Sequence, residues 1–307
     1  MADLQQSIEF VLRSGGVRAK VRKIGGSVVV EVPDPVGTSA LLENMPGVAW
    51  VAAGLAVGSF KELGPASGAL ARKYLRRGDR FAVGAEGTLG TVGSDVSGAV
   101  TSGVLDSVKG ARVSQEAPRA KFRAAFDGSK GVVGVELKRG PGGVPTGRES
   151  ASCLVSGGLH SSVVAWMAVL MGFRVRLVHA KCNEEALRAA ARLYSELSHR
   201  ADPRGLVLEV LEGGSEAGAL AEFVKSEGPV FGGFHSTSGA VPRVLGSAVL
   251  APLYLMPEEM YRSEFESLQV KGHDSMTDWR AARGGRVSAR TFGGVAADVS
   301  GVLDGLH

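Results

Sequence analysis

The sequence predicts an α/β protein whose first half is a mixed α+β unit and whose second half is a doubly wound parallel sheet. The chain has 307 residues, 44% of them hydrophobic, which is enough for two or three compact domains. Four glycines and two prolines within residues 140–147 interrupt any regular element there. Residues 1–150 carry 20 basic and 14 acidic side chains, a net charge of +6, whereas residues 151–307 carry 15 and 17, a net charge of −2. The halves are therefore predicted to be modules with different partners.

The first half reads as short helices and strands in mixed order. Leu4, Ile8, Val11 and Leu12 recur at helical spacing, and Gly25 and Gly26 separate two runs with strand patterns. In chain order we expect a helix over 4–13, strands over 17–22 and 27–32, helices over 41–43 and 60–77, a strand over 80–83, a helix from 94 to about 109, and strands over 121–126 and 132–137. The predicted division is 1–78, 79–139 and a linker over 140–150.

The second half, residues 151–307, repeats a strand, a loop and a helix. Strands are expected over 152–155, 174–179, 207–211 and 229–234, and helices over 161–171, 184–199 and 216–225. This alternation is typical of a parallel sheet with helices on both faces. Residues 271–307 are rich in glycine and weakly periodic, so no element is predicted for them.

The composition limits the setting of the protein. Cys153 and Cys182 are its two cysteines, the first residues have no signal-peptide pattern, and no apolar run is both long and free of charge. We therefore expect a cytoplasmic protein with no membrane contact and no structural disulfide. The overall charge of +4 alone does not indicate a nucleic-acid binder.

The clearest motif is the run Ser156-Gly157-Gly158-Leu159-His160-Ser161-Ser162, where a buried strand is expected to turn into a helix. Glycines let backbone N–H groups approach an anion, and a helix N-terminus offers unpaired donors. The run has neither the lysine of the kinase and GTPase loop nor the glycine spacing of dinucleotide domains. It predicts a phosphate site, although a tight turn without a ligand would use the same glycines.

Residues 156–161 resemble the SGGxDS signature of the PP-loop ATP pyrophosphatases. The run at 140–147 resembles the linker that precedes this signature in the tRNA 4-thiouridine synthetases. The resemblance implies a ferredoxin-like unit over 1–78, a THUMP domain over 79–139 and a PP-loop domain, of the adenine nucleotide alpha hydrolase type, over 151–307, without a rhodanese domain. It also implies ATP and Mg²⁺ as cofactors, and tRNA, an external sulfur donor protein and a second copy of the chain as partners.

The candidate site residues follow from the loop and from the ends of later strands. The nucleotide-binding candidates are Ser156, Gly157, Gly158, His160, Ser161, Ser162, His179, Ala180 and His235. The RNA-binding candidates are the basic residues Lys109, Arg112, Lys121, Arg123, Lys138 and Arg139, for which a solvated sheet edge is the alternative. Cys182 is the catalytic candidate, because Lys181 and the start of a helix could favour its thiolate, and an inert strand-end residue is the alternative. No metal site is predicted, since His179 and Cys182 have no second pair of ligands.

His160 stands where the family signature has an aspartate, and imidazole does not supply the hard anionic oxygen that Mg²⁺ prefers. No cysteine follows Cys182. The predicted function is ATP-dependent tRNA modification, in which a uridine oxygen is adenylated and then replaced by sulfur. Two alternatives stay open: a catalytically degenerate paralogue that binds RNA or nucleotide, and an ATP pyrophosphatase that acts on a small molecule.

Overall fold

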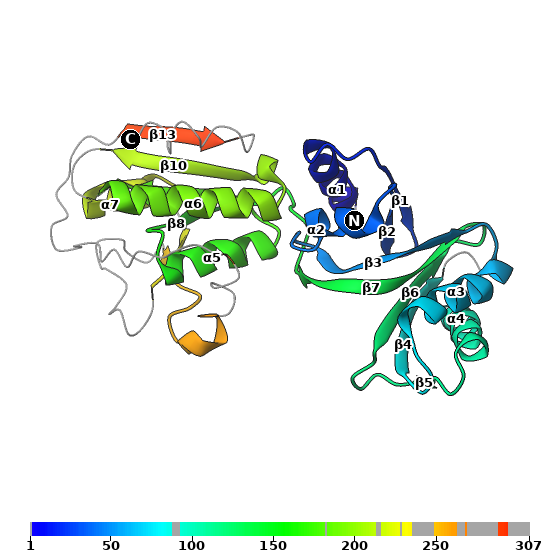
Figure 1. Ribbon diagram of the computed structural model, residues 1–307. Helices are drawn as coiled ribbons and strands as arrows, with labels where there is room; N and C mark the ends of the chain where they lie inside the picture. The colour runs from blue at the N-terminus through cyan, green and yellow to red at the C-terminus, as the bar shows by residue number, and fades with distance from the viewer. Residues whose placement is uncertain are drawn as a thin grey trace. The chain divides into compact units, whose positions relative to one another are not determined.

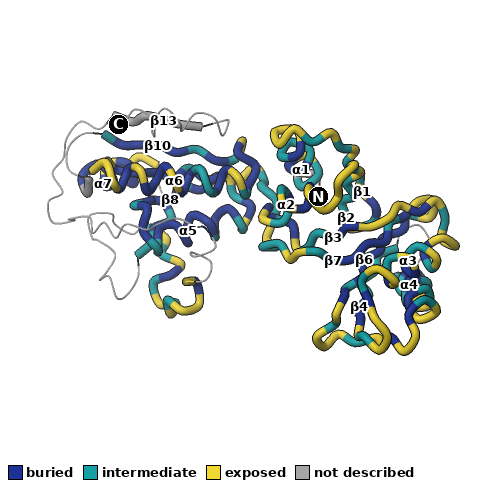
Figure 2. Tube along the Cα trace, viewed as in Figure 1, coloured by how far each residue is buried: buried dark blue, intermediate teal, exposed yellow. Residues whose placement is uncertain are grey.

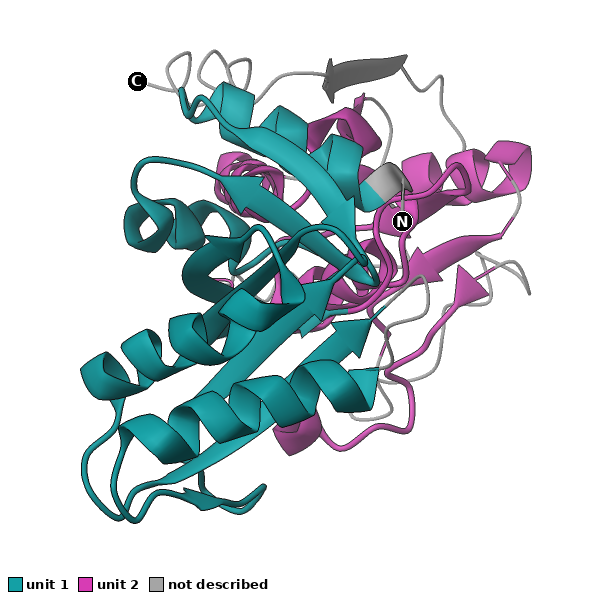
Figure 3. Ribbon diagram, turned by 90° about the vertical axis from the view of Figure 1, so that its right-hand side faces the viewer, with its two compact units in different colours: residues 1–142 teal, residues 143–307 magenta. Residues whose placement is uncertain are grey.

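The computed structural model describes residues 2–87, 93–181, 183–212, 216–227, 229–234, 249–262, 268 and 288–293. The chain divides into two compact units, Met1–Gly142 and Gly143–His307, which Figure 3 colours separately. The boundary between the units falls inside the glycine- and proline-rich run. The predicted further division at residue 78 does not appear as two separate units, because residues on both sides of it share one sheet and one buried core.

Unit 1 begins with a helix, a hairpin and a second helix: α1 (Ala2–Ser14), β1 (Lys20–Ile24), β2 (Ser27–Glu31) and α2 (Pro35–Leu42). Gly25 adopts a φ of 60°, which lets the two strands pair antiparallel across a tight turn. Helix α2 starts at residue 35 because Asp34 accepts a hydrogen bond from the Gly37 N–H and Pro35 occupies the first helical turn. Ile8, Leu12 and Leu42 form the core of this part.

The rest of unit 1 is a five-stranded sheet in the order β3-β7-β6-β4-β5 with two helices on one face. Its elements are β3 (Val48–Val57), η1 (Phe60–Glu62), α3 (Leu63–Tyr74), β4 (Arg80–Gly87), α4 (Gly93–Ser107), β5 (Arg112–Val113), β6 (Ala120–Phe126) and β7 (Gly131–Gly142). Helices α3 and α4 lie side by side (Figure 1). Phe81 and Phe122 pack edge to face beneath them and define which face of the sheet is buried.

Unit 2 is a six-stranded sheet in the order β12-β11-β8-β9-β10-β13. Its strands are β8 (Ser150–Leu154), β9 (Arg174–Ala180), β10 (Leu206–Glu212), β11 (Val230–Gly232), β12 (Val249–Leu250) and β13 (Ser288–Gly293). The first five are parallel, and β13 pairs antiparallel with β10. The helices are α5 (Leu159–Leu170), α6 (Glu184–Arg200), η2 (Pro203–Gly205), α7 (Glu216–Glu227) and η5 (Glu258–Met260).

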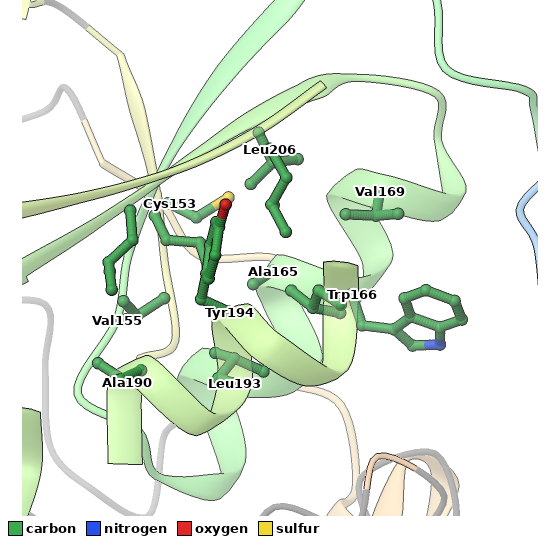
Figure 4. Packing of buried hydrophobic residues seen from close by; sticks show 14 of the residues in the cluster. Cys153, Val155, Ala165, Trp166, Val169, Ala190, Leu193, Tyr194 and Leu206 are labelled. Atoms are coloured by element: carbon green, nitrogen blue, oxygen red, sulfur yellow. The ribbon is translucent and has the colours of Figure 1, made fainter. Parts of the chain in front are cut away.

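The helices of unit 2 cover both faces of the sheet, which confirms the predicted doubly wound fold. Cys153 of β8 and Leu206 of β10 lie beside Tyr194 of α6 in one buried cluster, which also includes Trp166 of α5 (Figure 4). Helix α7 packs on the opposite face, where Phe223 meets a separate cluster. The buried stretches of α5 and α6 stand out in Figure 2.

Several elements differ from the sequence-based expectation. The expected helix over 41–43 is only the end of α2, and the sequence predicts no element at β3, β5 or β13. Strand β3 is rich in alanine and valine with little polar alternation, and β13 obtains its partner, β10, from about 80 residues away. Among the described residues, no helix combines the length and the apolar character needed to cross a membrane.

Candidate functional site

The carboxyl end of strand β8 lies at the point where the sheet of unit 2 changes direction. From β8 the chain adds β9 and β10 on one side, and β11 and β12 on the other. Loops that leave such a pair of strands diverge, and ligands of open α/β sheets bind in the resulting crevice. The turn at residues 155–158 and the end of β11 therefore meet at the position where a ligand is expected.

Two glycines shape the turn between β8 and α5. Gly157 has a φ of 79°, and a Cβ there would lie 3.0 Å from the carbonyl carbon of Ala189 and 3.1 Å from the nitrogen of Ala190 in α6. Gly158 is extended and precedes the first turn of α5, which no side chain of the described residues caps. The N–H groups of that turn are left for a ligand or solvent, and the helix dipole favours an anion there.

Serine side chains hold the turn in shape. Ser161 Oγ accepts a hydrogen bond from the Ser156 N–H at 3.2 Å and lies 3.2 Å from the Gly158 carbonyl oxygen. The two hydroxyls of Ser156 and Ser161 are also 3.2 Å apart. These contacts fold the loop before any ligand arrives, so little conformational entropy would be lost on binding.

Two buried polar atoms near the turn have no hydrogen-bond partner among the described residues: Ser162 Oγ and His179 Nε2. The side chains are 0% and 1% exposed. His179 Nδ1 lies 2.9 Å from the carbonyl oxygen of Val155, which begins the turn, so the ring sits directly against it. Burial lowers the pKa of His179, partly offset by this hydrogen bond, and keeps the ring neutral. A polar ligand or water would satisfy both atoms.

Strand β11 closes one side of the crevice. A Cβ on Gly233 would collide with the nitrogen of Ser161 and lie 2.6 Å from the carbonyl carbon of His160. Ala180, at the end of β9, is buried in the cluster beneath α7 and offers only backbone groups to a ligand. His235 and Cys182 lie outside the described residues. Of the predicted nucleotide-binding residues, the structure therefore brings 156–162 and His179 together.

His160 lies on the first turn of α5, and the segment after β12 packs against it. Its Nε2 lies 3.8 Å from Glu258 Oε2, and its ring meets the Tyr261 ring edge to face at 5.9 Å. Glu258 also pairs with Arg262. Leu253 and Tyr261 anchor the segment on α5 by packing on Val163 and Val164.

These groups do not fit a protein-held Mg²⁺. Mg²⁺ prefers oxygen ligands, but the side chain at this position of the turn is an imidazole. Glu258, the carboxylate beside it, already contacts Arg262 and His160. The described residues contain no cluster of three or more His, Cys, Asp or Glu that could hold a metal ion. The nucleotide fits the turn better than the metal does, because the donors and the orphaned polar atoms are present.

The predicted RNA-binding residues fall into two groups in unit 1. Arg123 donates to Glu136 Oε2 from Nε at 3.0 Å and from a terminal nitrogen at 2.6 Å, and its guanidinium lies 4.8 Å from the Trp50 ring centre. Arg139 also pairs with Glu136, and Lys138 pairs with a second carboxylate, each at 3.6 Å. These three side chains are held by acidic neighbours. Lys109, Arg112 and Lys121 are absent from the ion pairs of the described residues.

The pairing of strands in the sheet of unit 1 brings together a second set of basic residues, which are not close to one another in the sequence. Arg80 of β4 pairs with Arg112 of β5, and the Arg119 N–H donates to the Arg80 carbonyl oxygen at 2.8 Å. Lys121 pairs with Ala82 in the same sheet. Because side chains alternate along a strand and Phe81 and Phe122 point toward the helices, these four basic side chains point to the other face. We call Arg80, Arg112, Arg119 and Lys121 the basic sheet face.

Fold and site together define the class: a nucleotide-type α/β unit joined to an α+β unit that carries a basic sheet face. No family model matches the chain. Over 75 residues, 24% of this chain, it is 37% identical to a tRNA sulfurtransferase of Pyrobaculum aerophilum. Over 64 residues, 20% of this chain, it is 39% identical to a probable tRNA sulfurtransferase of Methanocaldococcus jannaschii. These matches span only 15% and 17% of the lengths of the two relatives.

Solved structures match a larger share of the chain. A crystal structure of the protein PH1313 from Pyrococcus horikoshii has a TM-score of 0.67 at 18% identity, covering 87% of this chain and 92% of that one. A 4-thiouridine synthetase–RNA complex with bound ATP has a TM-score of 0.61 at 16% identity, covering 92% and 86%. The two solved structures confirm the predicted fold, and the two short sequence matches fall on tRNA sulfurtransferases, in agreement with the predicted resemblance.

Proposed function

We propose that this protein binds tRNA through unit 1 and ATP at the turn after β8, and that it modifies the tRNA in an ATP-dependent sulfur transfer. The observation that carries the proposal is the turn itself: an uncapped helix start at the point where the sheet changes direction, with two buried polar atoms beside it that the described residues leave unpaired. The relatives with printed activities are tRNA sulfurtransferases, and the solved 4-thiouridine synthetase complex contains RNA and ATP.

The proposed nucleotide contacts use backbone and side-chain donors of residues 156–162. The N–H groups of the first turn of α5 bind phosphate oxygens, and Ser162 Oγ donates to the nucleotide. His179 Nε2, which accepts because Nδ1 faces a carbonyl oxygen, pairs with a donor of the ligand or with an ordered water. Ala180 contributes its backbone, and His235 stays a predicted contact.

The proposed reaction has two covalent stages. The uridine oxygen attacks the α-phosphorus of ATP, which forms an adenylated base and releases pyrophosphate. The terminal sulfur of a cysteine persulfide, delivered by an external donor protein, then attacks the activated ring carbon and AMP leaves. A thiol finally cleaves the sulfur–sulfur bond, which leaves one sulfur on the base and oxidises the thiol and the donor cysteine to a disulfide. Cys182 is the proposed thiol for that last step.

The proposed RNA contacts are electrostatic. The basic sheet face presents four cations on three neighbouring strands, and in the described part of the chain none of them is in an ion pair. Such a surface binds phosphates with little dependence on sequence, as recognition of folded RNA requires. Lys109, which follows α4 and is exposed, is a further proposed contact. Arg123, Lys138 and Arg139 are proposed to contribute less, because they already pair with carboxylates.

A titration tests the nucleotide half of the proposal. ATP binding to the full chain is measured by calorimetry with and without bulk tRNA, and pyrophosphate release is measured in parallel. Ser161→Ala removes the hydroxyl that holds the turn and is expected to weaken ATP binding. Ser226→Ala, on α7, removes a hydroxyl that donates to the backbone carbonyl oxygen of Phe223 in its own helix and serves as the matched control. Equal ATP affinity in the two variants would contradict the site.

Salt dependence tests the RNA half. The slope of log Kd for tRNA against log salt concentration is expected to decrease by about 0.7–0.9 for each phosphate that the protein no longer neutralises. Arg80→Ala with Arg112→Ala should therefore reduce the slope by about 1.5. Lys130→Ala, in the exposed turn between β6 and β7, is the control and should leave it unchanged. An unchanged slope in the double variant would remove the basic sheet face from the proposal.

The histidine at position 160 favours a second candidate function, which is binding of RNA and nucleotide without catalysis. The signature aspartate is absent and the neighbouring Glu258 is engaged in ion pairs. Such a protein would bind ATP but release no pyrophosphate in the presence of tRNA. Pyrophosphate release by the parent protein, with loss in Ser161→Ala, would eliminate this candidate.

A further inference from the structure

At the start of α5, the side chain of His160 contacts the segment over 251–262, which follows β12. His160 is the second residue of the helix, and its side chain is 21% exposed. The segment over 251–262 crosses α5 and brings Glu258, Tyr261 and Arg262 to this end of the helix. Glu258 is thus a carboxylate next to an imidazole and a guanidinium, and its contact with His160 is an ion pair only when the imidazole is protonated.

A carboxylate and an imidazole bind phosphate by different chemistry. A carboxylate at this position repels phosphate oxygens unless a divalent cation lies between them, whereas an imidazole donates a hydrogen bond to phosphate directly and adds a positive charge when protonated. The turn already supplies backbone donors and the positive end of the helix dipole. In this chain the side chain next to those donors therefore has the chemistry of a phosphate ligand.

We propose that His160 binds the nucleotide phosphates directly and takes the place of a protein-held divalent metal, so that ATP binds at this turn without Mg²⁺. This inference rests on the proposed nucleotide site. On binding, a phosphate oxygen replaces Glu258 as the anion beside His160 Nε2, while Glu258 keeps its pair with Arg262. His179 Nε2 and Ser162 Oγ, buried and unpaired among the described residues, are the independent sign that a polar ligand belongs beside this turn.

Glu258 separates this arrangement from a metal bridge. If His160 and Glu258 jointly held a cation, Glu258→Gln would remove a ligand and weaken binding of ATP in the presence of Mg²⁺. If His160 binds phosphate directly, Glu258→Gln removes a negative charge that competes for the imidazole, and binding becomes tighter. The two arrangements predict opposite signs for one substitution.

The experiment titrates the full chain with ATP, and separately with inorganic pyrophosphate, in EDTA and in Mg²⁺. For the parent we expect similar affinities in both buffers. His160→Asp should lose about tenfold or more in EDTA and recover in Mg²⁺, because an aspartate needs the cation. His160→Asn, which keeps a polar side chain without the charge, should weaken binding in both buffers. Glu258→Gln should bind more tightly than the parent, and thermal melts verify that each variant folds.

The outcomes of these titrations distinguish direct phosphate binding from a metal bridge. Parent binding that appears only with Mg²⁺ overturns the inference and leaves the proposed nucleotide site standing. Weaker binding by Glu258→Gln in Mg²⁺ also overturns it, in favour of a metal bridge. Absence of ATP binding in both buffers overturns the proposed nucleotide site together with the inference. Binding in EDTA that fails in His160→Asp and survives in Glu258→Gln supports it.

Discussion

Gly157→Ala tests whether the turn after β8 is packed as described. At a φ of 79° an alanine is in the left-handed region, which costs about 1–2 kcal/mol. Its Cβ would also collide with the Ala189 Cβ and lie 3.0 Å from the Ala189 carbonyl carbon, in the backbone of a buried helix that cannot move freely. Overpacking of this kind costs about 1–3 kcal/mol. The expected loss in the free energy of unfolding of unit 2 is therefore about 2–5 kcal/mol.

The assay is chemical denaturation with a matched glycine in unit 1. Gly78 has a φ of 82°, and a Cβ there would meet no atom within 4 Å, so Gly78→Ala carries the conformational cost alone, about 1–2 kcal/mol. Ala189→Gly in the Gly157→Ala background removes the nearest colliding atom and should recover about 1 kcal/mol relative to additivity. If Gly157→Ala costs no more than Gly78→Ala, and Ala189→Gly recovers nothing, the turn does not pack against α6.

Three further outcomes follow from burial and pairing. Burial raises the pKa of the Cys153 thiol to about 12, so iodoacetamide followed by peptide mapping should modify it only after unfolding. Burial lowers the pKa of His179 from 6.5, so the unfolded chain binds more protons than the folded chain. The free energy of unfolding is therefore retained above about pH 6.5 and decreases below it. His179→Gln should reduce the difference in unfolding free energy between about pH 7.5 and about pH 5.5. Glu136→Gln leaves the half-buried Arg123 without its carboxylate and should cost about 1–3 kcal/mol in denaturation, whereas Glu43→Gln, whose lysine partner is 60% exposed, should cost under about 1 kcal/mol.

The sequence predicts unit 2 better than unit 1 for a physical reason. Parallel strands buried on both faces read as apolar runs, and the helices between them carry a strong periodicity, so their order alone indicates the sheet. Strand β3 lacks such a signal: among the described residues it pairs with β7 alone, some 80 residues later, and Gly54 and Gly134 bring the two backbones close together. Such a strand is specified by tertiary contact rather than by its own pattern.

In the candidate site, too, features set by neighbouring residues can be predicted from the sequence, whereas contacts between residues far apart in the sequence cannot. The turn at 156–162 is predictable because glycine and serine determine backbone shape within a few residues. The partner of His160 is not, since Glu258 lies about 100 residues away and reaches the turn only because Leu253 and Tyr261 pack on α5. Arg123 illustrates the same limit for a charged residue. Its charge indicates a free cation, but β7 places Glu136 beside it, and the pair is internal to unit 1.

The distribution of charge in unit 1 therefore depends on register more than on composition. Arg123, Lys138 and Arg139 account for three of the positive charges of the first half, but they lie against two carboxylates, Glu136 and Glu43, so much of their charge is neutralised within unit 1. Arg80 and Arg112 sit in register on neighbouring strands without such partners in the described part of the chain. Neighbouring strands are about 4.8 Å apart, and long arginine side chains can spread from that spacing to successive phosphates. If unit 1 binds RNA as proposed, this register would orient the RNA backbone along the basic sheet face, whereas a cluster of equal charge without register would attract RNA without orienting it.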